Sequence, residues 1–184
     1  MMTSLLPGEA PLSLNEARSW LRLGASVDDA VVAGLIRAAS NICESFVGQW
    51  LIVRAAEEIV PAKAGEIRLA IRPVAGIDAV TLIAPDGSER AVAEPGRRLR
   101  IGPDGTGWLS VDGAEGADSA ARLRIGYRAG MSADGNGIPE AIRHGLLRMM
   151  QHLHAARDGE SGAPPAVIAA LWQPWRRVAL GGAR

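Results

Sequence analysis

The sequence predicts an α+β protein in which a helical bundle core carries a β-rich antiparallel insertion and a C-terminal tail. In residues 12–50, and again after residue 138, apolar side chains recur at spacings of three and four, which is the period of a buried helix face. Between these stretches, short apolar runs alternate with Gly, Pro and Asp, as is typical of strands joined by turns. Because the chain has 184 residues, we expect a single domain over residues 1–184.

Two helices are predicted within residues 12–50. Ser13 and Glu16 have the spacing of a capping box and indicate the start of a first, short helix. Ser26 and Asp29 repeat this spacing and indicate a second helix of about six turns. The apolar positions of the second helix are Val32, Leu35, Ile36, Ala39, Ile42, Cys43, Phe46 and Trp50.

Residues 51–130 form the predicted β-rich insertion. The turn sequence at 85–88 lies between two extended runs, at 80–84 and 89–93, and predicts a β-hairpin. Further strand candidates are Leu99–Ile101, Trp108–Val111 and Arg122–Tyr127. The Gly-rich segment 102–107 is interpreted as another hairpin turn, because it lacks the Lys and Ser or Thr of a phosphate-binding loop. We therefore expect about five to seven short antiparallel strands.

Residues 138–158 carry the strongest helical pattern, with Pro139 suited to the first turn. The apolar face comprises Ile138, Ala141, Ile142, Gly145, Leu146, Met149 and Leu153. Leu147 and Met150 widen this face beyond what one contact requires. The width predicts packing inside the subunit and against a neighbouring one.

Residues 164–184 are predicted to form a short helix, opened by Pro165 and ended or kinked by Pro174, and then a tail. Trp and Arg, which dominate the energy of protein interfaces, cluster here. The candidate interaction residues are Leu171, Trp172, Trp175, Arg176 and Arg177. The alternative is that the two tryptophans cover the protein's own core. Two arginines without a wider basic patch give little support for nucleic-acid binding.

The charge and cysteine content exclude several classes of protein. Twenty Lys and Arg balance twenty Asp and Glu, so no overall field attracts DNA or an anionic membrane. Cys43 is the sole cysteine, which excludes an intrachain disulfide and fits a reducing compartment, and its place on a helix face predicts a buried thiol. No apolar run approaches the roughly 18 to 20 residues of a membrane span, so we expect no membrane association.

No catalytic, cofactor or metal site is predicted. His144, His152 and His154 lie on one helix, but their separations of 8 and 2 residues do not match a helical metal pair. Glu57 and Glu58 are adjacent on a predicted strand, where their side chains point to opposite faces and cannot form an acid/base pair. Asp134 and its glycines lack the acidic positions of a calcium loop, and no serine lies in a nucleophile turn.

The order of these features resembles one known family. The segments LSLNEARSWLRL, FVGQWL, RIGYRAG, IPEAIRHGLL and PPAVIAALWQPWRRVAL follow one another around the β-rich middle. This order resembles the head–tail connector, or adaptor, proteins of long-tailed bacteriophages and of phage-derived gene transfer agents. The resemblance covers nearly the whole chain and rests on this order and on YRAG followed closely by IPEAI, not on catalytic residues.

The resemblance implies a structural protein of the virion or gene transfer agent particle, made in the bacterial cytoplasm. Such proteins form a homo-oligomeric ring, commonly dodecameric, beneath the portal protein ring, and offer a platform to a downstream neck or tail protein such as a stopper. DNA passes through their channel without sequence-specific binding, which suits a chain of zero net charge. The resemblance also implies that the C-terminal residues named above reach the portal. The alternatives are another neck component such as a stopper, or a small ligand-binding or enzymatic domain from a phage-related operon.

Overall fold

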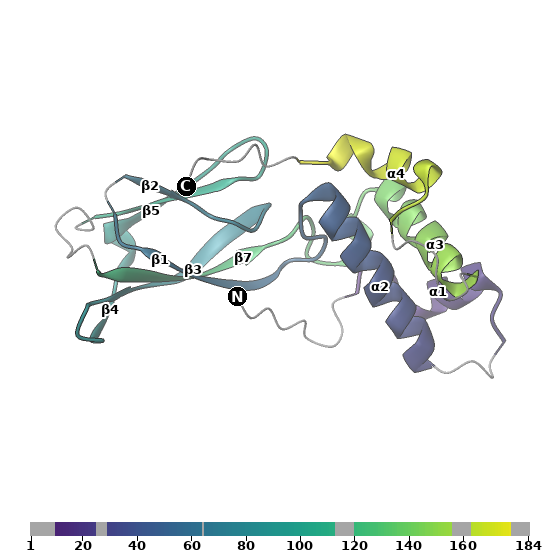
Figure 1. Cartoon of the computed structure of the whole chain (residues 1–184), viewed down its shortest axis with the longest axis horizontal. Helices are drawn as coiled ribbons and strands as arrows, with labels where there is room; N and C mark the ends of the chain where they lie inside the picture. The colour runs from purple at the N-terminus through teal and green to yellow at the C-terminus, as the bar shows by residue number, and fades with distance from the viewer. Residues whose placement is uncertain (1–9, 25–28, 64, 113–119, 156–162, 178–184) are drawn as a thin grey trace. The chain divides into compact units, whose positions relative to one another are not determined.

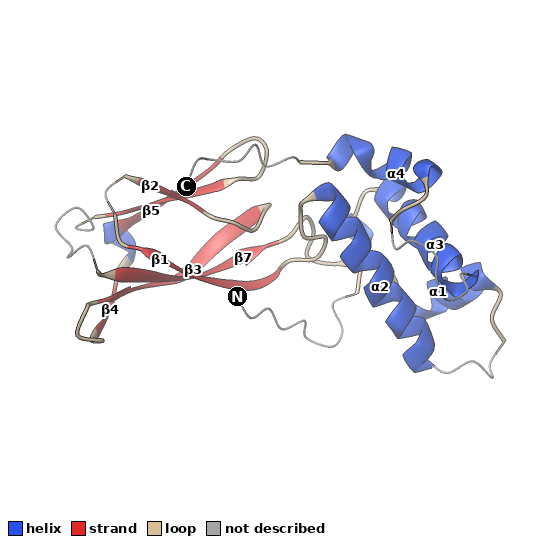
Figure 2. Ribbon diagram, viewed as in Figure 1, coloured by secondary structure: helices blue, strands red, loops and turns tan. Residues whose placement is uncertain are grey.

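The computed structural model describes residues 10–24, 29–63, 65–112, 120–155 and 163–177 (Figure 1). The described residues divide into two compact units, a β unit between residues 53 and 130 and a helical unit made of the described residues of 10–52 and 131–177. The described α-helices, α1 to α4, lie in the helical unit, and the described strands, β1 to β7, lie in the β unit (Figure 2). The predicted α+β class is therefore confirmed.

The helical unit contains four α-helices in the part that the structure describes. They are α1 (Leu14–Leu21), α2 (Asp29–Val47), α3 (Glu140–Ala155) and α4 (Ala166–Trp172), and a 3₁₀-helix (Gln173–Trp175) follows α4. The predicted cap of α1 is present, because the Ser13 hydroxyl accepts the backbone N–H of Glu16 at 3.1 Å. The Glu16 carboxylate does not complete the capping box and instead binds Arg143 at 2.7 Å, which joins α1 to α3. Ser26, the second predicted cap, lies outside the described residues.

Helix α2 ends at Val47, earlier than the sequence pattern to Trp50 predicts. Gly48 adopts a left-handed conformation (φ 68°), and its N–H donates to the Glu44 carbonyl at 2.9 Å. This is the helix end that glycine favours. The Glu44 carboxylate then accepts the N–H of Leu51 at 2.9 Å, so the chain turns away directly after the helix.

The core of the helical unit forms between α2, α3 and α4. On α3 it buries the predicted apolar face together with its second flank, since Leu147 is 8% exposed and Met150 is 0% exposed. The expectation that this extra width faces a neighbouring subunit is therefore wrong. The remaining members of the cluster include Val32, Ile36, Ala39, Cys43, Val47, Ile142, Leu146, Met149, Ile168 and Trp172.

Helix α2 is long and apolar enough, by length and composition alone, to cross a membrane, with a mean hydropathy of 1.4 over an 18-residue window. The sequence expectation that no stretch approaches this length is corrected accordingly. Core helices of soluble proteins pass the same test. One side of α2 packs in the core of the helical unit through Val32, Ile36 and Cys43, which accounts for much of its apolar character.

The β unit contains two antiparallel sheets. The strands are β1 (Arg54–Pro61), β2 (Glu66–Arg68), β3 (Val74–Ile83), β4 (Glu89–Ala91), β5 (Arg97–Ile101), β6 (Gly107–Val111) and β7 (Arg122–Ala129). The first sheet has the order β1-β7-β3-β4 and the second β2-β6-β5. The predicted hairpin is β3–β4, and the Gly-rich segment 102–107 forms the turn between β5 and β6, as expected. In the central strand β7 every second side chain is buried, at Leu123, Ile125, Tyr127 and Ala129.

Glu57 and Glu58 lie on opposite faces of β1, as predicted, with Glu57 exposed and Glu58 buried. The Glu58 carboxylate accepts the Tyr127 hydroxyl and, at 2.9 Å, the N–H of Ala70. The Tyr127 hydroxyl in turn accepts the N–H of Ile71 at 3.1 Å. Burial, and then the bond to Glu58, raise the pKa of Tyr127. This polar cluster joins β1 and β7 to the segment after β2 and has a structural role.

Candidate interaction site at the C-terminal segment

Trp172 is fully buried in the helical unit. Its ring lies against Gly145 of α3, where an added Cβ atom would come within 2.8 Å of the indole Cε2. The indole N–H donates to the Ile142 carbonyl at 3.3 Å, and the ring of Phe46 lies 6.0 Å away between centroids. Trp172 therefore belongs to the protein's own core, as in the alternative interpretation of the sequence, and we withdraw it from the candidate interaction residues.

Leu171 and Trp175 are partly buried and pack against the same core. The carbonyl of Trp175 accepts the side-chain N–H of Gln49 at 2.5 Å. Gln49 is itself 7% exposed, so this is a buried polar link between the C-terminal segment and the end of α2. Loss of this hydrogen bond would leave a buried polar group without its partner and would lower the stability of the helical unit.

Arg176 and Arg177 follow the 3₁₀-helix and have exposed side chains. The guanidinium carbon of Arg176 lies 5.1 Å from the ring centroid of Phe46, within the range of a cation–π interaction. The backbone N–H of Arg177 donates to the carbonyl of Val47 at 2.7 Å. The segment is thus held against the end of α2 while it presents two cationic side chains. Periodicity could not reveal the roles of Phe46 and Gln49, because they depend on contacts between distant parts of the chain.

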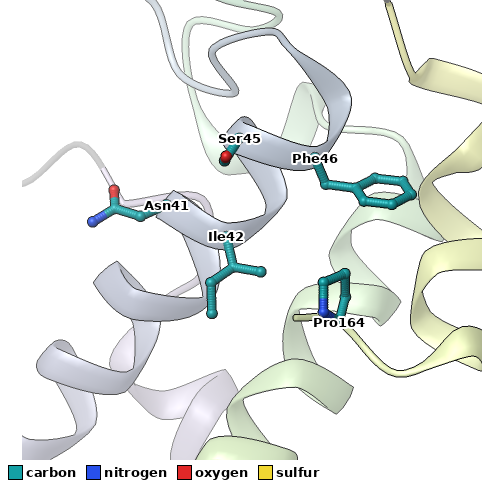
Figure 3. A pocket seen from close by; sticks show the side chains of 5 residues that line it. All are labelled: Asn41, Ile42, Ser45, Phe46 and Pro164. Carbon is teal, nitrogen blue, oxygen red and sulfur yellow. The ribbon is translucent and has the colours of Figure 1, made fainter. Parts of the chain in front are cut away.

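A shallow hollow of about 350 Å³ opens beside this segment (Figure 3). Its lining residues are Asn41, Ile42, Ser45, Phe46 and Pro164. Phe46 therefore both lines the hollow and supports Arg176. The lining carries no ionisable group, so the hollow suits an apolar or aromatic side chain better than a charged ligand.

The histidines of α3 are not brought together with other metal-ligating residues. Within the described ranges, no three His, Cys, Asp or Glu side chains lie close enough to hold a metal ion. His144 instead contacts the ring of Trp20 edge-on, with 5.4 Å between centroids.

Asp134 accepts the N–H groups of Asn136 and Gly137 in the 3₁₀ turn before α3, which is the loop the sequence predicts. Burial raises the pKa of the Cys43 thiol, which is inaccessible in the core.

Comparison with known proteins gives full-length matches among solved structures. A chain in the neck of an empty GTA particle, computed with C6 symmetry, has a TM-score of 0.78 and 30% identity, with all of both chains covered. A chain in the virion of a native gene transfer agent (GTA) particle has a TM-score of 0.77 and 28% identity, covering 98% of this chain and 96% of that one. A chain in the neck of a native GTA particle, computed with C12 symmetry, has a TM-score of 0.77 and 26% identity over the full length of both.

No protein-family model matches the sequence, and neither does any curated protein. The full-length structural matches nevertheless define the class of protein, a structural component of the particle neck. The chain belongs to the head–tail connector family of long-tailed bacteriophages and gene transfer agents, as the order of its sequence features predicts.

Proposed function

We propose that the protein is the adaptor of a phage-like or gene transfer agent particle. It forms a ring at the head–tail junction beneath the portal, continues the DNA channel and offers a platform to the next neck or tail protein. The observation that carries this proposal is the match over the whole length of both chains to a protein in a neck computed with C12 symmetry. A twelvefold axis relates twelve equivalent copies around a central channel.

The charge balance of the chain supports a passive channel. A ring through which DNA slides gains nothing from many neutralised phosphates, since each would add salt-dependent affinity. Several arginines of the β unit are engaged with carboxylates, as in the pairs Arg124 with Glu89 at 2.9 Å and Arg100 with Glu66 at 2.6 Å. Their charge is thereby compensated locally. We therefore expect DNA contact without sequence specificity and without a catalytic step.

For the portal contact we propose Leu171, Trp175, Arg176 and Arg177. The bonds from Gln49 and to Val47 fix where this segment leaves the helical unit, so its two cationic side chains start from a defined position. Trp and Arg are the side chains that most often dominate binding energy. An acidic or aromatic groove on the portal is the surface that this pair would recognise.

The test is portal binding by the double variant Trp175→Ala, Arg176→Ala. We expect it to lose portal attachment while its far-UV circular dichroism stays that of the wild type. Arg90→Ala, at an exposed position of β4, is the matched control and should bind normally. Because Trp175 also packs on the core, Arg176→Glu is measured as well, since the Arg176 side chain is exposed and its one described contact is with the ring of Phe46. If both variants bind the portal like the wild type, the assignment of this segment is wrong.

The second candidate is a different neck component, such as a stopper. It is favoured by the match to a neck computed with C6 symmetry, which fits a component present in six copies as well as one present in twelve. Copy number and the order of binding separate the two roles. An adaptor binds the bare portal ring, whereas a stopper binds only after another neck protein is in place.

A further inference from the structure

The side of α2 that faces away from the core, all of which the structure describes, carries one exposed charged residue, Arg37, at its margin and none along its centre. The positions on this side follow spacings of three and four and form one stripe. We call this stripe the docking face; it comprises Val31, Gly34, Ala38, Asn41 and Ser45. Asp29 and Glu44 lie outside it, whereas the exposed Arg37 borders it, three residues after Gly34 and four before Asn41. Val31 is 51% exposed, and the space around Gly34 is open, so the face is not covered by the described chain.

A solvent-facing helix surface is normally polar and charged, so a neutral one calls for a partner. The hollow beside Pro164 continues this face, because Asn41 and Ser45 belong to both (Figure 3). The hollow has a volume of about 350 Å³, which is enough for a large side chain. One arginine at the margin of the face gives little attraction for DNA phosphates, which are bound by clusters of Lys and Arg. The occupant is therefore a protein surface with an aromatic or apolar anchor.

The opposite side of the helical unit presents such an anchor. Helices α2 and α3 both belong to the helical unit (Figure 1) and pack together through their buried faces, so their outward faces point away from each other. The outward face of α3 carries His144 and Arg148, and the ring of Trp20 from α1 lies against His144. Trp20 is 37% exposed and is the one aromatic residue among the exposed large hydrophobic side chains of the described chain. We call Trp20, His144 and Arg148 the anchor patch.

We propose that the docking face of one copy binds the anchor patch of the next copy, with Trp20 in the hollow. The occupant is a second copy because the similar neck chains occur in assemblies of cyclic symmetry. A cyclic ring requires two different surfaces on opposite sides of each subunit, and these two surfaces meet that requirement. Trp and Arg on one side and an uncharged hollow on the other are typical of an interface centre. The inference rests on the proposed adaptor ring and names the contact that closes it.

Crosslinking tests this contact. The double variant Ser45→Cys, Arg148→Cys places one thiol on the docking face and one on the anchor patch, both at exposed positions. It is treated with a flexible bis-maleimide, once alone over a concentration series and once with the portal ring from the same source. We expect a ladder of crosslinked species that ends at the closed ring. The buried Cys43 adds no product, which the wild-type chain checks.

The single variants Ser45→Cys and Arg148→Cys are the matched controls. In a head-to-tail ring each carries a thiol on one surface only, so neither should form a ladder. Adding Asn41→Glu to the double variant places a charge in the docking face and should reduce the ladder at least about tenfold. Arg90→Glu, on β4, should leave it unchanged.

Absence of a ladder in both arms overturns the inference, and so does a crosslinked dimer from Ser45→Cys alone, because that product shows the docking face pairing with itself. Failure of the adaptor role is read separately, from the amount of protein that the portal ring takes up. Twelve copies on the portal without a ladder would leave the adaptor role intact and show that the ring closes through other surfaces.

Discussion

Replacing Gly145 by Ala is expected to destabilise the helical unit, although Ala is the better helix former. The added Cβ would lie 2.8 Å from Cε2 and 2.9 Å from Cδ1 of Trp172, well inside the roughly 3.5 to 4.0 Å at which carbon atoms pack. Trp172 must then move in a core where its surroundings are close-packed. Overpacking of this kind costs about 1 to 3 kcal/mol.

A displaced indole also loses its bond to the Ile142 carbonyl, which leaves a buried N–H unsatisfied and costs about 1 to 3 kcal/mol more. The higher helix propensity of Ala relative to Gly offsets about 1 kcal/mol of this destabilisation. The net expectation for Gly145→Ala is a loss of roughly 3 kcal/mol in the free energy of unfolding, or about 6 to 12 °C in Tm for a chain of this size.

The assay is urea unfolding followed by circular dichroism at 222 nm, with Gly34→Ala as the matched control. Gly34 is also in a helix, but a Cβ there meets nothing within 4 Å, so that variant should gain about 1 kcal/mol. Adding Trp172→Phe to Gly145→Ala should recover part of the loss, because the smaller ring relieves the overlap. If Gly145→Ala is as stabilising as Gly34→Ala, the packing of Trp172 on α3 is not as described.

Three further predictions concern single groups. Tyr127→Phe removes the hydroxyl that donates to Glu58 and accepts the N–H of Ile71. The free energy of unfolding measured in urea should fall by about 2 to 3 kcal/mol. A loss near zero would show that the buried cluster is not formed. Cys43 should not react with a thiol reagent in the native protein and should react at once in denaturant, because burial both hides it and raises its pKa; rapid native labelling would contradict this. The hydrogen bond from Arg100 lowers the pKa of Glu66 below its ordinary 4.5. The native state therefore binds a proton at Glu66 less readily than the unfolded state does. The contribution of the ionised Glu66 to stability is present above pH 4.5 and is lost as pH falls through the lowered pKa. The Tm difference between the wild type and Glu66→Gln should therefore shrink on acidification, and a constant difference would refute the assignment.

Much of the fold could be predicted because its signals are local. The hydroxyl of Ser13 caps α1 through a residue three positions away, and the turn between β3 and β4 depends on a few adjacent residues. The end of α2 was also marked locally, by Gly48, but the apolar pattern continues past it to Trp50 and conceals the break. A periodic pattern reports which side chains favour burial, and glycine conformation decides where the helix stops.

The parts that could not be predicted depend on pairs of residues far apart in the chain. Gly145 stands out in the sequence as a glycine inside a helix, yet only the structure shows that its missing side chain makes room for Trp172. The sequence likewise does not distinguish Trp172 from Trp175, because both are tryptophans in one short segment, yet Trp172 is buried and Trp175 is partly exposed. For the second flank of α3, the sequence predicts a contact with a neighbouring subunit, because it does not show that the unit's own core covers Leu147.

The central claim is that this chain forms a ring on the portal, and the most direct measurement is the native mass of the purified protein, alone over a concentration series and then mixed with the portal ring from the same source. We expect a defined ring-on-ring complex with twelve copies, the number that the C12 symmetry of a neck containing a similar chain suggests. If a folded portal ring takes up none of the folded protein, the adaptor role is contradicted, and another place in the neck must be sought.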